Sequence, residues 1–174
     1  MLLILAIVFG SVLLDQVTKM LVLAYLQGKP SFPLWEDVLH FTFVKNPGAA
    51  FGMLSNARWV FMSASTVAIV GIFYYLIKYR PQNKLLTVSL AMIAGGGIGN
   101  MIDRVCYGYV VDFIDFTLID FAVFNVADSF VSVGACVLIA YLLLDILKEL
   151  KAGKAKAQDA SEQTLETENE HDGE

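Results

Sequence analysis

The chain has 174 residues, a length that fits one domain. Its apolar fraction is 57%, above the roughly 45–50% typical of soluble domains, so it needs an apolar solvent such as a bilayer. The net charge of −5 comes from residues 159–174, which hold seven acids and no Lys or Arg; the rest carries twelve basic and ten acidic residues. The sequence predicts no nucleic-acid partner, because it shows no basic patch, and no zinc site, because its two His residues are far apart. No other metal or cofactor is expected.

Four stretches are long and apolar enough to cross a bilayer, which takes about 20 residues of helix. They are residues 2–26, 59–77, 85–102 and 125–147. The first has no basic residues before it and no small-x-small cleavage pattern after it, so we expect an uncleaved span rather than a signal peptide. The predicted fold class is an all-α membrane protein with four transmembrane helices.

Basic residues indicate how these spans are oriented. They gather in the short loop at 78–84 and after the fourth span, at 148–156. Because Lys and Arg in short loops favour the cytoplasmic side, both segments should be cytoplasmic, and four spans then put both termini there. Residues 27–57 and 105–124 should lie on the extracytoplasmic side.

The segment between the first two spans is too apolar for a plain solvated loop. Leu39, Phe41 and Phe43 alternate as in a strand with one apolar face, and residues 46–48 (Asn-Pro-Gly) are typical of a turn. We therefore expect a small extracytoplasmic β-sheet-like element between the first and second helices, lying against the membrane surface.

The C-terminal end differs in composition from the rest of the chain. Residues 158–174 are polar and acidic, with Leu165 as the one apolar residue apart from alanine. Such a segment cannot bury enough apolar surface to order itself, so we expect a disordered cytoplasmic tail after a membrane domain of residues 1–157.

Ionisable residues at membrane depth cost about 2.5–3.5 kcal/mol each on insertion scales, so they are candidates for function. Asp15 and Lys19 are four apart and share a helix face, where a simple ion pair explains them as well as a direct role does. Asn100, Asp103 and Arg104 follow a glycine-rich run at 95–99. Helix packing accounts for the glycines, but it does not account for the three polar residues together.

Asp112 and Asp128 are the candidate catalytic pair. Asp112 lies among apolar neighbours, and Asp128 follows Asn125 by three residues at the start of the fourth span. Asp128 alone could be a favourable residue at a helix N-terminus. Two carboxylates at close range cannot both ionise readily, so one can accept a proton from water while the other polarises a peptide carbonyl. The pattern favours an aspartyl peptidase, because no Ser or Thr has a paired base and no His is near Cys106 in the sequence.

In five blocks the chain resembles the lipoprotein signal peptidase family, the aspartyl peptidases also called signal peptidase II. The blocks are Asp15-Gln16-Val17-Thr18-Lys19, Asn46-Pro47-Gly48-Ala49-Ala50-Phe51-Gly52, Gly99-Asn100-Met101-Ile102-Asp103-Arg104, Val111-Asp112-Phe113 and Phe124-Asn125-Val126-Ala127-Asp128-Ser129. Each block alone is a weak signal, but the five occur in family order across residues 15–129.

The resemblance implies a bacterial inner-membrane enzyme whose active site lies near the extracytoplasmic face. It implies removal of signal peptides from diacylglyceryl-modified prolipoproteins, by cleavage just before the lipidated cysteine, with Asp112 and Asp128 catalytic. The expected partners are the lipidated prolipoprotein, membrane lipid and globomycin-type inhibitors. Residues expected to bind substrate or support the site are Asp15, Lys19, Asn46, Gly48, Ala50, Phe51, Asn100, Asp103, Arg104 and Asn125.

Two other classes of protein fit part of the pattern. A small transporter or channel could use Asp15, Lys19, Asp103 and Arg104 as an ion pathway. An ion pathway needs polar residues throughout the membrane, whereas the central parts of the spans at 59–77 and 125–147 contain almost no polar residues. A non-enzymatic membrane scaffold would leave the acidic residues within the spans unexplained.

Overall fold

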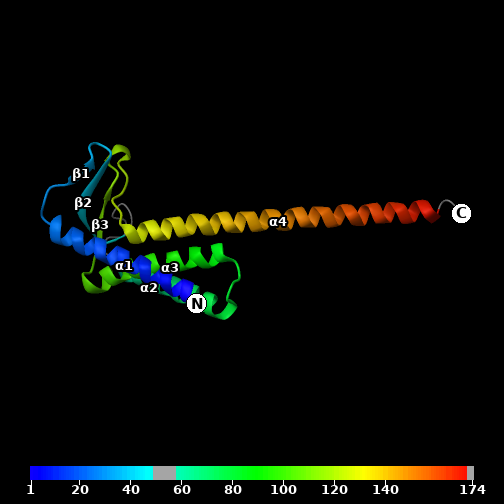
Figure 1. The fold of residues 1–174 in the computed structure, drawn as a ribbon, viewed down its shortest axis with the longest axis horizontal. Helices are drawn as coiled ribbons and strands as arrows, with labels where there is room; N and C mark the ends of the chain where they lie inside the picture. The colour runs from blue at the N-terminus through cyan, green and yellow to red at the C-terminus, as the bar shows by residue number, and fades with distance from the viewer. Residues whose placement is uncertain (49–57, 172–174) are drawn as a thin grey trace. The chain divides into compact units, whose positions relative to one another are not determined.

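The computed structural model describes residues 1–48 and 58–171 of the chain (Figure 1). The elements in chain order are α1 (Leu2–Tyr25), β1 (Phe32–Trp35), β2 (Leu39–Asn46), α2 (Arg58–Tyr79), α3 (Lys84–Cys106), β3 (Val110–Asp115), the short 3-10 helix η2 (Thr117–Ile119) and α4 (Val126–His171). The chain divides into two compact units, residues 1–138 and 139–174. The site described below lies within the first unit.

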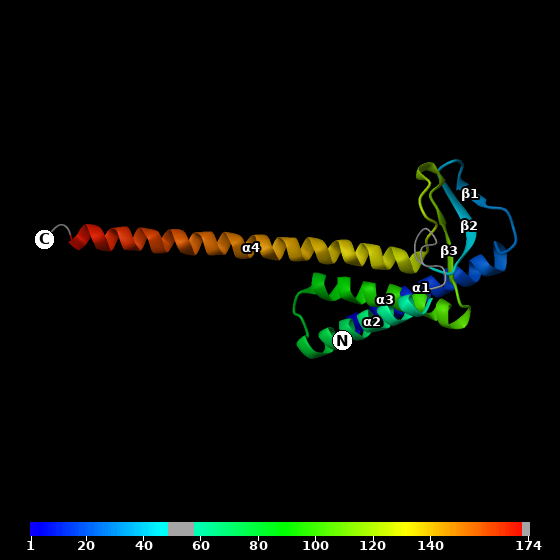
Figure 2. The same ribbon diagram turned by 180° about the vertical axis from the view of Figure 1, so that it is seen from behind.

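The four predicted membrane spans are confirmed as helices. Within the described residues, the segments apolar and long enough to cross a bilayer are Leu2–Tyr25, Trp59–Tyr79, Lys84–Cys106 and Val126–Gly153. Figures 1 and 2 show α1, α2 and α3 side by side. Large apolar side chains such as Phe9 and Val67 are 68% and 73% exposed, as expected for helices whose outer faces meet lipid rather than water.

Small residues on α3 allow neighbouring helices to approach closely, as the glycine run predicted. A Cβ atom added at Gly99 would lie 2.5 Å from Asp15 Oδ2, and one added at Gly96 would overlap the carbonyl oxygen of Ala127. The absence of these side chains therefore lets α1 and the first turns of α4 pack against α3. This packing brings the acidic residue of α1 into contact with the backbone of α4.

The predicted small sheet is also present, with one difference. It has three antiparallel strands in the order β1-β2-β3, and β2 pairs with β3 through Val44 opposite Asp112 and Lys45 opposite Val111. The sequence predicted strand structure only between the first two helices, whereas β3 follows α3. Val111 and Phe113 of β3 pack with Val22 of α1 in an apolar cluster, which fixes the sheet on the end of the first helix.

The fourth helix extends beyond the membrane span to His171. The structure therefore differs from the predicted disorder over residues 158–171. Ala, Gln, Glu and Leu are strong helix formers, and this segment is rich in them, so its composition also suits a helix. The division into a membrane domain and a separate tail stays a prediction.

Candidate active site

Asp112 and Asp128 line the same cavity, of about 340 Å³, at the sheet end of the helices. Its other polar side chains include Asn46, Asn100 and Arg104. Residues 121–124 supply an apolar wall. The cavity therefore combines two carboxyl groups with amide and guanidinium donors beside an apolar surface, which suits a substrate with both a peptide backbone and an apolar part.

Asp112 is held on both of its carboxyl oxygens. β3 places it in the sheet, where it is 2% exposed. The side-chain amide of Asn46 donates to Oδ2 at 2.8 Å, and that of Asn125 donates to Oδ1 at 2.6 Å. Since Asn46 ends β2 and Asn125 precedes α4, two separate elements fix the orientation of this carboxyl group.

Asp128 lies in the first turn of α4 and is bound in a similar way. The Asn100 amide donates to its Oδ1 at 2.7 Å, and the backbone N–H of Asn125 approaches its Oδ2 at 3.2 Å. In return, the Asp128 N–H donates to the side-chain oxygen of Asn125 at 2.9 Å. This reciprocal pair resembles a helix N-terminal capping box and fixes Asp128 relative to Asn125.

Asn100 and Asn125 join the two carboxyl groups into one hydrogen-bonded chain. Asn125 donates both to Asp112 and, at 3.0 Å, to the side-chain oxygen of Asn100. Lys19 Nζ donates to that same oxygen at 2.9 Å. Because an ammonium group can only donate, the Asn100 oxygen must face Lys19 and its NH₂ group must face Asp128. Lys19 thus determines which atom of Asn100 meets the candidate catalytic carboxyl group.

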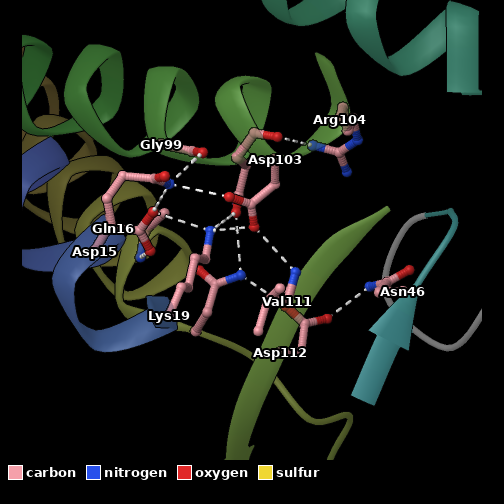
Figure 3. Close-up of polar contacts among 12 residues, drawn as sticks. Asp15, Gln16, Lys19, Asn46, Gly99, Asp103, Arg104, Val111 and Asp112 are labelled. Atoms are coloured by element: carbon pink, nitrogen blue, oxygen red, sulfur yellow. Dashed lines mark hydrogen bonds and ion pairs between the residues drawn. The ribbon is translucent and has the colours of Figure 1, made fainter. Parts of the chain in front are cut away.

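A buried ion cluster of Asp15, Lys19 and Asp103 (Figure 3) contacts this hydrogen-bonded network through Lys19. Lys19 Nζ lies 2.9 Å from both Asp15 Oδ2 and Asp103 Oδ2, and all three side chains are almost fully buried. Asp15 Oδ1 accepts the Ala127 N–H of α4 at 2.9 Å, and Asp103 Oδ2 accepts the Val111 N–H of β3 at 3.0 Å. The cluster therefore connects α1 and α3 to the elements that carry the two candidate catalytic residues.

Arg104 borders the cavity on another side. Its guanidinium group donates to the carbonyl oxygen of Gly48 at 3.1 Å and to that of Asn100 at 3.3 Å. It also lies over the ring of Phe61, 5.8 Å from the centroid. The guanidinium group thereby links α3 to the chain just after β2, while it remains beside the carboxyl groups of the cavity.

The environment of Asp112 favours its protonated form. Burial, with a smaller contribution from the nearby charge of Asp128, raises the pKa of this carboxyl from its usual 3.8 to about 6, although the hydrogen bonds from Asn46 and Asn125 and the charge of Lys19 act in the opposite direction. A carboxyl group with this pKa can hold a proton near neutral pH. The arrangement can therefore present one protonated and one ionised carboxyl group to the same substrate.

The structure brings together most of the residues that the sequence predicted for the site. Besides the two catalytic candidates, they are Asp15, Lys19, Asn46, Gly48, Asn100, Asp103, Arg104 and Asn125. Ala50 and Phe51 lie outside the described residues. Lys19 contacts the site through Asn100, and Asp15 contacts it through the α4 backbone. The two residues therefore form an ion pair with each other and also support the site.

One contributor was missed. Gln16 donates to Asp15 at 3.1 Å, to the Gly99 carbonyl at 3.2 Å and to Asp103 at 3.0 Å, so it bridges α1 and α3. It carries no charge, but its place beside Asp15 within an apolar span, and within the first block of the family resemblance, could have indicated a role. The backbone N–H groups of Val111 and Ala127 also take part, which no side-chain pattern reveals.

Comparisons with known proteins agree on the kind of molecule. The family model described as Signal peptidase (SPase) II matches residues 7–144. The lipoprotein signal peptidase of Caldanaerobacter subterraneus subsp. tengcongensis is 51% identical over 133 residues, which cover 76% of this chain and 90% of the relative. That of Brevibacillus brevis is 44% identical over 132 residues, with 76% and 89% covered.

Solved structures show the same fold. A bacterial membrane enzyme determined by the in meso method at 2.3 Å resolution superposes with a TM-score of 0.76 at 35% identity, over 82% of this chain and 88% of that one. A second, determined at 1.9 Å, gives a TM-score of 0.73 at 34% identity, over 80% and 92%. Fold and relatives together define a bacterial membrane peptidase with four membrane-spanning helices. The chain belongs to the signal peptidase II family.

Proposed function

We propose that this protein is an aspartyl endopeptidase that removes signal peptides from diacylglyceryl-modified prolipoproteins, cutting just before the lipidated cysteine. The observation that carries the proposal is the pair of carboxyl groups, Asp112 and Asp128, which line one cavity and are joined through Asn125 and Asn100. The relatives named as lipoprotein signal peptidases supply the substrate class.

The chemistry needs one proton shared between the two carboxyl groups. The ionised carboxylate takes a proton from a water molecule as the water oxygen attacks the scissile carbonyl carbon, and the protonated carboxyl donates its proton to the carbonyl oxygen. The tetrahedral intermediate then collapses: the C–N bond breaks, the nitrogen takes the proton that the first carboxylate had accepted from water, and the carbonyl re-forms as its hydroxyl returns a proton to the second carboxylate. Both carboxyl groups return to the starting state, with one proton between them.

Asp112 is the better candidate for the proton carrier before substrate binds, because burial raises its pKa to about 6. Asp128 lies at the N-terminus of α4, where the helix dipole favours negative charge, so it is the better candidate for the ionised base. Asn100 and Asn125 can keep donating to these carboxyl groups in either protonation state, since carboxyl oxygens accept hydrogen bonds in both.

The substrate's diacylglyceryl group would remain in the bilayer while its peptide reaches the two carboxyl groups. The apolar wall at 121–124 suits such a bipartite substrate, since it borders the cavity. Globomycin-type cyclic peptides should compete for the same cavity. The proposed place of the enzyme is the bacterial cytoplasmic membrane, with both termini in the cytoplasm and the dyad near the extracytoplasmic face.

The test is incubation of the purified protein with a lipidated prolipoprotein, followed by mass analysis of the products. The wild-type protein should release the signal peptide and leave a fragment that begins with the lipidated cysteine. Asp112→Asn and Asp128→Asn should each lower turnover by at least about a thousandfold, since neither variant can form the one-proton pair.

Asp120→Asn is the matched control, because it removes a carboxylate near the sheet that does not line the cavity. It should cleave at the wild-type rate. Substantial cleavage by either dyad variant, or a product cut at another bond, would contradict the proposal.

A further inference from the structure

A second cavity, of about 380 Å³, lies at the other end of the helices. We call it the loop-end cavity; its walls come from the start of α1, the end of α2, the start of α3 and the loop between them. Figures 1 and 2 show the start of α1 beside that loop. Along α3, Lys84 in its wall precedes Asn100 of the catalytic site by sixteen residues, or about 24 Å of helix, so the two cavities are separate.

The charged residues that line the loop-end cavity are all cationic. Arg80 and Lys84 are exposed side chains in its wall, and no acidic residue is among the lining residues. Among the described side chains, the ion pairs join Lys19 to Asp15 and Asp103, so neither Arg80 nor Lys84 is neutralised by a carboxylate there. Gln82 adds a side-chain amide to the lining, whereas the Thr87 hydroxyl donates to the backbone carbonyl oxygens of Asn83 and Pro81. Such a set recognises an anion with several acceptor oxygens.

The remaining lining is apolar. Ile4 and Leu76, which are 6% and 1% exposed, belong to the apolar cluster between α1, α2 and α3, and Pro81 and the half-exposed Leu3 extend this wall outward. Tyr79 and Tyr74 lie exposed at the same end of α2, with Lys78 over both rings. Exposed tyrosines near a helix end are typical of the boundary between lipid and water. The anion that fits here therefore also carries an apolar part.

We propose that the loop-end cavity binds the phosphate group of an anionic phospholipid, with Arg80 and Lys84 as its cationic contacts. The guanidinium group of Arg80 offers paired donors to phosphate oxygens, and Lys84 adds a second positive charge. Basic pockets between transmembrane helices on the cytoplasmic side bind such head groups, and the sequence predicts this end to be cytoplasmic. Inorganic phosphate shares the anion but lacks the acyl chains that the apolar wall would contact. The inference does not depend on the proposed peptidase function.

The test is native mass spectrometry of the detergent-purified full chain, titrated with phosphatidylglycerol or with phosphatidylcholine of the same chain length. The wild-type protein should retain one phosphatidylglycerol more tightly than phosphatidylcholine. The double variant Arg80→Gln/Lys84→Gln should weaken that site about 25-fold, since each basic residue near an anionic headgroup contributes about fivefold. Inorganic phosphate at millimolar concentration should not displace the lipid.

The matched control is Lys78→Gln/Lys148→Gln, which removes two positive charges outside the cavity. This control variant should keep most of the lipid binding. An equal loss of binding in both double variants would mean that positive charge attracts the lipid non-specifically, which would contradict a site in the loop-end cavity. Displacement of the lipid by inorganic phosphate would mean a simple anion site and would also overturn the proposal.

A second route covers a double variant that fails to fold. Gln82→Cys, in a chain lacking Cys106 and Cys136, puts a thiol in the cavity wall, and a bulky maleimide on it should block phosphatidylglycerol. Unchanged lipid retention after this modification would refute the proposal independently of Arg80 and Lys84. Thermal unfolding in phosphatidylcholine, equal for all variants, shows that the fold is intact.

Discussion

The groups that touch the two candidate catalytic carboxyl groups directly are mainly neutral amides. Asn46 and Asn125 donate to Asp112, and Asn100 donates to Asp128. An amide orients a carboxyl group without adding a charge, whereas a directly bound lysine would strongly favour the ionised form. Lys19 donates to the side-chain oxygen of Asn100 and so reaches the carboxyl groups only through that amide. This arrangement fixes geometry while the pair can still share a proton.

The raised pKa of Asp112 predicts a pH dependence of catalysis. If Asp112 carries the proton, kcat/KM should fall as pH rises through about 6, because its ionisation leaves two carboxylates and no acid. Cleavage rates at low substrate concentration, measured from pH 4 to 9, give this profile. A rate that stays flat across pH 5 to 8 would contradict the assignment of the proton to Asp112.

The same pKa predicts how stability changes with pH. The native carboxyl has a pKa of about 6, and an unfolded Asp has one of about 3.9, so the native state binds the proton more tightly. This contribution, about 3 kcal/mol, is fully present below about pH 3.9 and is lost as pH rises through about 6. Asp112→Asn should remove this part of the pH dependence of thermal unfolding, whereas Asp120→Asn should keep it.

Lys19 should be critical for stability. It is the one cation bound to both Asp15 and Asp103 within the described residues, and all three groups are buried. Lys19→Met would leave two buried carboxylates unpaired, at a cost of about 3–5 kcal/mol, and would free the orientation of Asn100. Thermal unfolding in detergent measures the loss.

Two further variants identify the cause of that loss. Lys19→Met/Asp103→Asn should recover part of the stability, because one unpaired charge is removed. Lys29→Met, at an exposed position, should have no effect. If Lys19→Met unfolds at the wild-type temperature, the ion cluster does not stabilise the native state.

At this scale the sequence was most informative about charged residues. Acidic and basic groups in apolar spans are costly, so the positions of Asp15, Lys19 and Asp103 along the chain were enough to mark them as candidates for function. Gln16 was missed because a neutral amide costs less at the same depth and stands out less. The exact partners of each Asn were beyond prediction, because they depend on distances of a few tenths of an ångström between different elements.

At the scale of elements, helices were easier to predict than strand pairing. The span predicted at 85–102 appears as Lys84–Cys106, because an apolar run identifies the membrane core but does not identify the polar turns that continue the helix. β2 was predicted from its alternation, whereas β3 was not. Lys45 of β2 pairs with Val111 of β3, although α2 and α3 lie between the two strands in the sequence. A local sequence pattern cannot predict a pairing between strands so far apart.

The contact between α3 and α4 yields a prediction about a single glycine. A Cβ at Gly96 would overlap the backbone oxygen of Ala127 and lie 2.8 Å from a Val131 methyl group, so Gly96→Ala must push α4 away. We expect a loss of about 1–3 kcal/mol in stability and lower turnover, since α4 carries Asp128. Thermal unfolding and the cleavage assay measure both effects.

Gly97→Ala is the matched control on the adjacent residue. Its Cβ would lie 3.2 Å from the end of the Ile69 side chain, which can move aside at little cost. Equal effects of the two substitutions would mean that the cost arises from α3 itself rather than from its contact with α4.

At the scale of the whole molecule, the two ends of the first three helices differ in charge and chemistry. The dyad cavity and the sheet lie at one end, and the basic loop at 78–84 lies at the other. The positive-inside rule assigns the basic loop to the cytoplasm, so the dyad should lie near the extracytoplasmic face. A lipoprotein precursor that has been translocated would present its lipidated cysteine on that side, within reach of water for hydrolysis.

This topology can be tested with single cysteines and a membrane-impermeant thiol reagent in intact cells. Cys106 and Cys136 are both exposed, so they must first be replaced. Gly28 and Gly108 have positive φ values of 75° and 82°, which disfavour cysteine, so the exposed neighbours Lys29 and Tyr107 are better positions. Lys29→Cys and Tyr107→Cys should be labelled from outside.

Gln82→Cys and Ala157→Cys should be protected in intact cells and labelled only after the membrane is made permeable. Both lie where basic residues predict the cytoplasm, one in the loop between α2 and α3 and the other beyond the fourth span. The reverse pattern would invert the orientation and place the dyad on the cytoplasmic side. A translocated precursor could not then reach Asp112 and Asp128, and the proposed reaction would fail even if both carboxyl groups were chemically competent.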